Sequence, residues 1–164
     1  MKYSRDLKYA VSAFIVIFLE AAFGKYIAIS GAIPMLTFAF VIVCALFEDD
    51  ISYIMMVSVI LGVFGDILYS HGFGVYTVSY CFAAYYTFKL KDSIFSSKLL
   101  FLVIDAFILC AMQQFFYMII HISDIGAAYF WRGFFLIGLP SSLYTTAVCC
   151  LFYFIGSSIF RKRR

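Results

Sequence analysis

Long apolar runs, separated by short polar or glycine-containing breaks, make up nearly the whole chain. A run of about 20 apolar residues matches the length of a helix that crosses the hydrocarbon core of a bilayer. On that basis we predict six helical spans, at residues 9–29, 34–47, 51–70, 75–90, 99–121 and 134–160. The chain is therefore predicted to be an all-α integral membrane protein, a six-helix polytopic bundle in which residues 1–164 form a single transmembrane domain.

Two of these runs depart from the simple pattern. Residues 34–47 would extend only about 21 Å as a helix, so this helix must continue into the acidic turn at 48–50, thin the bilayer or insert half way. Pro34 suits the first turn of that helix, where a missing N–H costs nothing. In the last run, Pro140 begins a stretch that is long enough to span alone. We therefore expect residues 133–139 to form an interfacial or broken start of the last helix.

The composition supports a membrane protein and excludes a soluble enzyme. Hydrophobic residues make up 65% of the chain and charged residues 13%, whereas soluble domains are roughly half apolar and a quarter charged. Almost nothing remains outside the bilayer to form a catalytic domain. The basic N-terminus followed by an apolar run resembles a signal peptide, but Glu20 interrupts the run, so we interpret it as a retained first helix. The five cysteines lie in apolar runs without metal-binding spacing and are predicted to act as small hydrophobes.

The distribution of lysine and arginine predicts the orientation, because cytoplasmic loops carry an excess of these residues. With six spans and both termini in the cytoplasm, only Lys25 and Arg132 lie outside. Ten basic residues then lie inside: Lys2, Arg5, Lys8, Lys89, Lys91, Lys98, Arg161, Lys162, Arg163 and Arg164. Five spans, the alternative, would place one basic terminus outside. The basic tail is expected to contact anionic lipid rather than nucleic acid.

A face of small and polar residues marks the third span. Its members recur at spacings of three and four residues, which places them on one side of a helix: Ser58, Gly62, Gly65, Asp66 and Tyr69. Small residues let a neighbouring helix approach closely, and Asp66 lies about one turn from the outer end of its helix. We therefore favour a packing role for this face, with Asp66 fixing the turn before Gly74, over a role in ion transport.

The other buried polar candidates are Glu20, Asp105 and Gln113. Ionisable residues inside spans are costly and often functional, and Asp105 is expected to be protonated or hydrogen-bonded if it faces the bundle. The three carboxyl groups could form a proton relay only if the helices bring them together. His71 and His121 both fall on the outer side, but no clustered carboxylate or thiol supports a metal site between them. We find no catalytic constellation, phosphate-binding loop or cofactor motif.

One segment resembles the central signature of a known family. The pattern Gly62-x-x-Gly65-Asp66-x-Leu68-Tyr69-Ser70-x-x-x-Gly74 is similar to that of the MreD family, bacterial rod shape-determining membrane proteins. Other features agree with the resemblance and cover nearly the whole chain: Pro34 before a short second span, the basic segment Lys89-Leu-Lys91, Pro140-x-x-x-Tyr144 early in the last helix, and a basic tail.

The resemblance implies a non-enzymatic scaffold in the bacterial inner membrane. Its expected partners are an MreC-like membrane protein and, indirectly, MreB filaments and a RodA-type glycosyltransferase with its penicillin-binding protein. No cofactor is implied. The alternative is a vitamin-binding subunit of an energy-coupling-factor transporter, since those subunits are also small six-span proteins and are expected to share the fold. A membrane enzyme acting on lipid ranks last.

Overall fold

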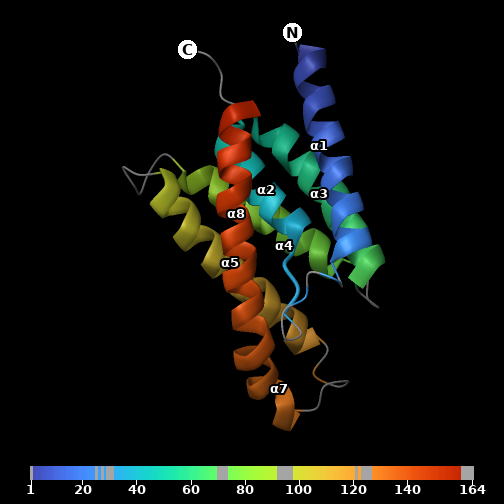
Figure 1. Ribbon diagram of the computed structural model, residues 1–164, viewed down its shortest axis with the longest axis vertical. Helices are drawn as coiled ribbons and strands as arrows, with labels where there is room; N and C mark the ends of the chain where they lie inside the picture. Colours follow the sequence, from blue (N-terminus) through green and yellow to red (C-terminus); the bar gives the residue numbers. More distant parts are fainter. Residues whose placement is uncertain are drawn as a thin grey trace.

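The computed structural model describes residues 2–24, 26, 28, 32–69, 74–91, 98–120, 122 and 127–159. All the regular elements within these residues are helices, so the predicted all-α class is confirmed. They are α1 (Lys2–Phe23), α2 (Leu36–Phe47), α3 (Ile51–Tyr69), α4 (Val75–Leu90), α5 (Lys98–Ile120), α7 (Ala127–Gly133), η1 (Phe134–Gly138) and α8 (Leu139–Ile159) (Figure 1). The predicted boundaries of α3 and α5 hold to within one residue and those of α4 hold as predicted. Helix α1, in contrast, begins and ends earlier than predicted.

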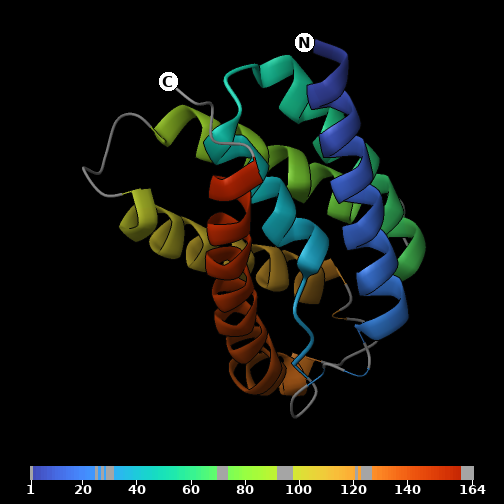
Figure 2. The same ribbon diagram turned by 45° about the horizontal axis from the view of Figure 1, so that its top comes forward.

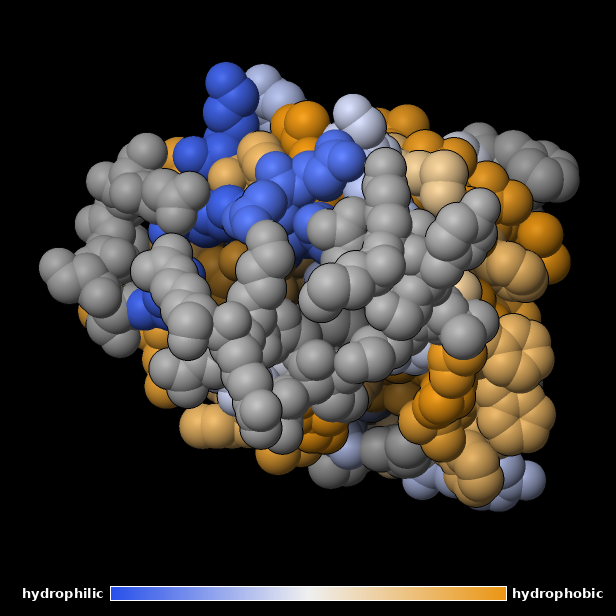
Figure 3. All heavy atoms as spheres, turned by 90° about the horizontal axis from the view of Figure 1, so that it is seen from above, coloured by the Kyte–Doolittle hydropathy of each residue, from blue (hydrophilic) through white to orange (hydrophobic). Residues whose placement is uncertain are grey.

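Helices α1, α2, α3, α4, α5 and α8 alternate in direction. Helix α1 begins at the same end of the molecule at which α8 ends (Figures 1 and 2). Figure 3 looks onto that end and shows hydrophilic side chains gathered on part of it, with hydrophobic side chains along the flanks. The loop residues Asp49 and Asp50 and the helix-end residues Lys89 and Lys98 are exposed. Exposed apolar side chains cover the sides, as expected for surfaces that face lipid.

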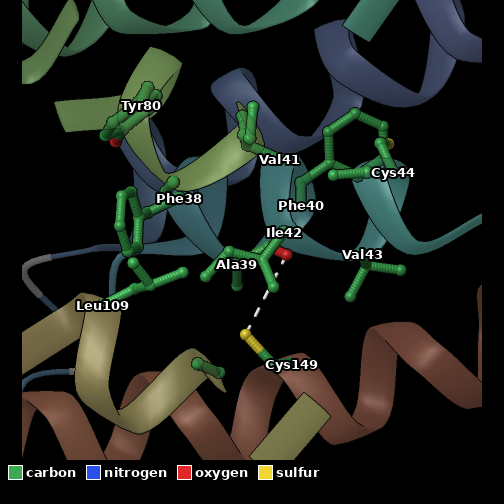
Figure 4. Close-up of a cluster of buried hydrophobic side chains, with 14 of the residues drawn as sticks. Phe38, Ala39, Phe40, Val41, Ile42, Val43, Cys44, Tyr80, Leu109 and Cys149 are labelled. Atoms are coloured by element: carbon green, nitrogen blue, oxygen red, sulfur yellow. Dashed lines mark hydrogen bonds between the residues drawn. The ribbon is translucent and has the colours of Figure 1, made fainter. Parts of the chain in front are cut away.

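Helix α2 lies at the centre of the structure. Every residue from Leu36 to Leu46 is buried, and α1, α3, α4, α5 and α8 all pack against it. An even distribution of apolar residues around a helix is typical of burial on all sides. Figure 4 shows its side chains inside the core, with the Cys149 thiol 3.9 Å from the Ala39 carbonyl oxygen.

This position corrects the expectations for the second span. Helix α2 ends at Phe47, and Glu48 is already extended, so the helix does not continue into the acidic turn. Its shortness needs no thinning of the bilayer, because protein rather than lipid surrounds it. Pro34 is not in the first turn, since Met35 is the N-cap; the buried Pro34 lies just before it.

Three of the described helices are long and apolar enough to cross a membrane, covering Ile51–Tyr69, Lys98–Ile120 and Tyr129–Ser157. Tyr9–Phe23 and Leu36–Phe47 are shorter apolar helices, and α4 has 16 residues. These lengths support a membrane protein. The count of six spans stays a prediction, because the shorter helices do not reach the length of roughly 20 apolar residues that a membrane span needs.

The last helix is continuous rather than broken. Helices α7 and α8 are joined through the π-helical turn η1, in which the Leu139 N–H donates to the carbonyl of Phe134. Pro140 follows at once, and it has no N–H to offer the carbonyl one turn before it. A π-turn is a common way to absorb such an interruption without ending a helix. The predicted broken start is therefore wrong, and residues 133–139 are helical.

Helices α3 and α4 pack most closely where two glycines replace side chains. A Cβ at Gly62 would overlap Thr77 Cα and lie 3.0 Å from Thr77 N, and one at Gly65 would lie 3.1 Å from Tyr76 Cβ. The Gly62 contact is backbone on α4, which cannot move aside as a flexible side chain can. The absence of a side chain at these two glycines lets the helices approach closely.

We predict that Gly62→Leu destabilises the protein by roughly 1–3 kcal/mol, because the added side chain forces α4 away from α3. Thermal unfolding of the detergent-purified protein, followed by size-exclusion chromatography, measures the loss. Val63→Leu is the matched control, since Val63 is exposed on the same helix. Equal stability of the two variants would contradict a tight α3–α4 contact at Gly62.

Candidate functional site

The N-termini of helices α2 and α4 lack side-chain caps from their own N-cap residues. A helix leaves its first N–H groups without partners, and Ser, Thr, Asp or Asn at the N-cap normally satisfies one of them. At α2 the N-cap is Met35, and at α4 it is Gly74; neither makes a side-chain capping bond. Gly74 has φ of 104°, a left-handed conformation that glycine adopts without strain. Partners for these N–H groups must therefore come from other helices.

Asp66 supplies the cap of α4 from the neighbouring helix α3. Its Oδ1 accepts a hydrogen bond from the Tyr76 N–H at 2.9 Å, and its Oδ2 accepts bonds from the Thr77 N–H at 3.2 Å and the Thr77 hydroxyl at 2.6 Å. Asp66 is 4% exposed. The glycines Gly62 and Gly65 lie on the same face and bring the first turn of α4 within its reach.

Glu20 does the same for α2 from helix α1. Its Oε2 accepts a hydrogen bond from the Thr37 N–H at 2.6 Å, and the Tyr69 side chain also bonds to the carboxyl group. The Met35 N–H donates to Thr145 Oγ1 at 3.1 Å, so α8 helps to cap the same end. Glu20 is 3% exposed, which places this carboxylate inside the protein rather than in lipid.

A group of tyrosines connects the two capped ends. The Thr37 and Tyr80 hydroxyls lie 2.8 Å apart, and the Tyr80 ring packs against that of Tyr76. Tyr76 also packs against Tyr69 and Tyr117, with ring centroids 5.9 and 6.1 Å away. Tyrosines of α3, α4 and α5, together with Thr37 of α2, thus lie between Glu20 and Asp66.

The third intramembrane carboxyl group is partnered elsewhere. Asp105 Oδ2 accepts a hydrogen bond from the Thr87 hydroxyl at 2.6 Å, across the α4–α5 contact. Each of Glu20, Asp66 and Asp105 thus has its own partners, and no hydrogen bond joins one carboxyl group to another among the described residues. Within the part of the chain that the structure describes, the three carboxyl groups thus have separate sets of direct hydrogen-bond partners.

Gln113, the fourth buried polar candidate, differs from the carboxyl groups. It is 1% exposed, and within the described part of the chain neither its side-chain nitrogen nor its oxygen has a hydrogen-bond partner. Among the described residues, this buried amide thus makes no hydrogen bond to another part of the protein.

The remaining predicted residues lie as follows. Ser58 is buried and its hydroxyl bonds to the Ile54 carbonyl at 2.8 Å, while Tyr69 and Tyr144 are half-buried against the core. Pro140 is exposed on α8. Among the described residues no three His, Cys, Asp or Glu side chains could share a metal ion. His71, His121 and the turn at 70–73 lie outside the described residues.

The turn that Asp66 was predicted to fix lies outside the described residues, so that role stays a prediction, and the contact of Glu20 with the start of α2 was not predicted from the sequence. A signal was present, because no capping residue precedes the apolar run of α2. A buried helix without its own cap needs an acceptor from elsewhere, and Glu20 is an acidic residue of an adjacent span. Thr145 and Thr87 gave no comparable signal, since hydroxyls in apolar helices commonly bond to their own backbone.

Comparison with known proteins gives one match. The family model described as rod shape-determining protein MreD matches residues 5–163, nearly the entire chain. No curated protein and no solved structure matches. The expected likeness to the substrate-binding components of energy-coupling-factor transporters therefore stays a prediction.

We predict that Asp66→Ala lowers stability by about 1–3 kcal/mol, because it leaves buried donors at the start of α4 unsatisfied. Asp66→Asn should cost less, since its amide oxygen still accepts one bond. A double-mutant cycle with Thr77→Val, read by thermal unfolding, measures the coupling between the two side chains. The exposed neighbour Ile67→Ala is the control. Additive effects of the Asp66 and Thr77 substitutions would refute the bond between the two side chains, and wild-type stability of Asp66→Ala would refute the cap.

Proposed function

Since the chain belongs to the MreD family, and is therefore a rod shape-determining membrane protein, we propose that it acts as a non-enzymatic scaffold of the cell-elongation machinery. In this role it links an MreC-like membrane protein, and through it MreB filaments, to peptidoglycan synthesis by a RodA-type glycosyltransferase and its penicillin-binding protein. The observation that carries the proposal is the family match over residues 5–163.

The use of the intramembrane carboxyl groups supports a scaffold. Glu20 and Asp66 bind backbone N–H groups at helix starts, and Asp105 binds a threonine hydroxyl. Groups held in this way stabilise the bundle and are poorly placed to transfer protons to a substrate. The polar residues that suggested chemistry from the sequence are thus accounted for by architecture.

Apolar side chains on the outer helices offer surfaces for partner helices. Phe14 and Phe18 of α1 are 70% and 60% exposed, and Leu151 and Phe154 of α8 are 62% and 60% exposed. Helices associate in membranes through such van der Waals contacts, without a hydrophobic driving force. We propose that one of these surfaces, which are also bathed by the lipid bilayer, receives the MreC-like protein. The predicted partner-interaction residues on α3 lie inside the bundle. They would affect the association with the MreC-like protein by stabilising the fold.

The alternative of a vitamin-binding subunit is not favoured. The family match over residues 5–163 supports a protein of cell shape. A nanomolar vitamin found by mass spectrometry in the purified protein would reverse this preference.

We propose that the protein is a multi-pass protein of the bacterial inner membrane with both termini in the cytoplasm. Helix α1 begins at the end of the molecule where helix α8 ends, which supports termini on one side of the membrane (Figure 2). The excess of basic residues assigned to that side supports the cytoplasm.

Depletion of the protein from a rod-shaped bacterium that encodes it should give rounded cells, and the tagged wild-type chain should restore rods and retain the MreC-like protein on purification. Asp66→Ala should lower the protein level or the amount of this complex, whereas Ile67→Ala should not. Cells that remain rods after depletion but need an added vitamin for growth would overturn the scaffold. A normal level, complex and shape with Asp66→Ala would show that Asp66 is dispensable.

For the topology, a reporter fused after Arg164 should be active only in its cytoplasmic form, and one fused before Lys2 should agree with it. Opposite locations of the two reporters would indicate an odd number of spans and favour the five-span alternative.

A further inference from the structure

The last helix is too long for the hydrocarbon core of a bilayer. Its apolar stretch Tyr129–Ser157 has 29 residues, which extend about 43 Å at 1.5 Å per residue. The core is roughly 30 Å thick, and the bilayer with both headgroup layers is roughly 40–45 Å thick. A tilt of about 45° would be needed to fit the stretch into the core, beyond the usual range of roughly 0–40°. One end of this helix therefore lies among lipid headgroups.

The α7 end is the one that leaves the core. Near the other end, Leu151, Phe154 and Ile155 of α8 are apolar and exposed, as side chains in contact with acyl chains should be. With Ser157 at one boundary of the core, the roughly 20 residues that cross it end at Gly138. Helix α7 precedes Gly138 and lies at the end of the molecule opposite to both termini (Figure 1).

Helix α5 supports the same boundary. It begins at Lys98, which is exposed and whose ammonium group should stay at the membrane surface. Roughly 20 residues later, the length that crosses the core, α5 reaches Met118. A Cβ at Gly138 would lie 3.6 Å from the Met118 methyl group, so these two residues are at similar depth. Both helices thus place α7 beyond the hydrocarbon.

The surface of α7 has the composition expected at headgroup level. Tyr129 and Trp131 are 63% and 60% exposed, and Arg132 is exposed beside them. Tryptophan and tyrosine favour the membrane interface, where the ring meets apolar groups and its N–H or O–H meets polar ones. A guanidinium group is unfavourable in hydrocarbon and binds phosphate through two N–H groups. The Trp131 ring also stacks on that of Phe135, with centroids 6.2 Å apart.

We propose that α7 is a membrane-surface anchor, in which Arg132 binds the phosphate of an outer-leaflet phospholipid and Tyr129 and Trp131 lie level with the ester groups. In this position α7 fixes how deeply the bundle sits in the bilayer. The anchor goes beyond the scaffold role and extends to α7 the interfacial position expected for residues 133–139. Its depth rests on the length and composition of the helix, and only the choice of leaflet rests on the proposed orientation.

Fluorescence quenching in vesicles tests the anchor, because Trp131 is the single tryptophan of the chain. The full chain is reconstituted in phosphatidylethanolamine and phosphatidylglycerol. Part of the lipid carries a nitroxide on the headgroup, bromines near the glycerol, or bromines near the end of the acyl chain. The headgroup nitroxide and the shallow bromines should quench Trp131 most, and the bromines at the chain end least. Acrylamide in the buffer should quench it weakly.

Three variants give the reference and the role of the charge. Trp131→Phe combined with Leu151→Trp moves the tryptophan to a position of similar exposure, 62%, within the part of α8 assigned to the core. That tryptophan should be quenched most by the bromines at the chain end. Arg132→Leu should shift the quenching of Trp131 toward the deeper bromines, because no charge then holds α7 at the surface. Arg132→Lys should leave the profile unchanged, since a lysine also reaches the phosphates.

Several results would overturn the anchor. Strongest quenching of Trp131 by the bromines at the chain end would place α7 in the hydrocarbon. Strong quenching by acrylamide with little by any lipid would place it in water, and protection from acrylamide only when the MreC-like protein is bound would assign α7 to a protein partner. An unchanged profile in Arg132→Leu would refute the role of Arg132. Depletion and reporter fusions test the scaffold and the orientation separately, since neither depends on the depth of Trp131.

Discussion

Helix α2 has no face on lipid or water, so every polar group at its two ends must find a partner within the surrounding helices. At its N-terminus, Glu20 of α1 and Thr145 of α8 accept hydrogen bonds from backbone N–H groups. At its C-terminus, the Lys91 amino group donates to the Glu48 carbonyl oxygen. The peripheral helices are thus tied to the central one by polar contacts as well as by apolar packing. Because hydrogen bonds are directional, these contacts specify how the helices are placed, which the packing of apolar side chains against lipid-like surroundings does poorly.

The N-terminus of α4 is likewise capped by a residue from another helix. Gly74 turns the chain through a left-handed conformation but offers no side chain, and Asp66 of α3 replaces the missing cap. Gly62 and Gly65 make this possible by removing the side chains that would hold α4 away. A carboxylate that bonds two backbone N–H groups and a hydroxyl is stable in a low dielectric, where the same group unpaired would be strongly unfavourable. Glu20 and Asp66 are thus explained by helix N-termini that need hydrogen-bond acceptors.

The buried polar residues differ in whether they have hydrogen-bond partners. Glu20, Asp66 and Asp105 are bonded within the bundle, and most of the exposed residues on the described outer helices are apolar. A shape-determining membrane protein built in this way presents apolar surfaces to other membrane proteins. Its buried carboxyl groups stabilise its own fold. Gln113 departs from the pattern, since it is buried beside a cavity and is unpartnered within the described residues.

The sequence by itself determined the helical class, most helix boundaries and the shared face of Gly62, Gly65 and Asp66, because these follow from apolar run length and helical periodicity, which are local properties. It also identified the family. The central position of α2, its cap from Glu20, the continuity of the last helix through η1 and the cavity beside Gln113 were decided only by the tertiary structure. Lipid and protein interior are equally apolar, so composition cannot tell a helix at the centre from one at the periphery. Nor can spacing along one helix show which neighbour a buried carboxylate will reach, since that depends on how separate helices are placed in space.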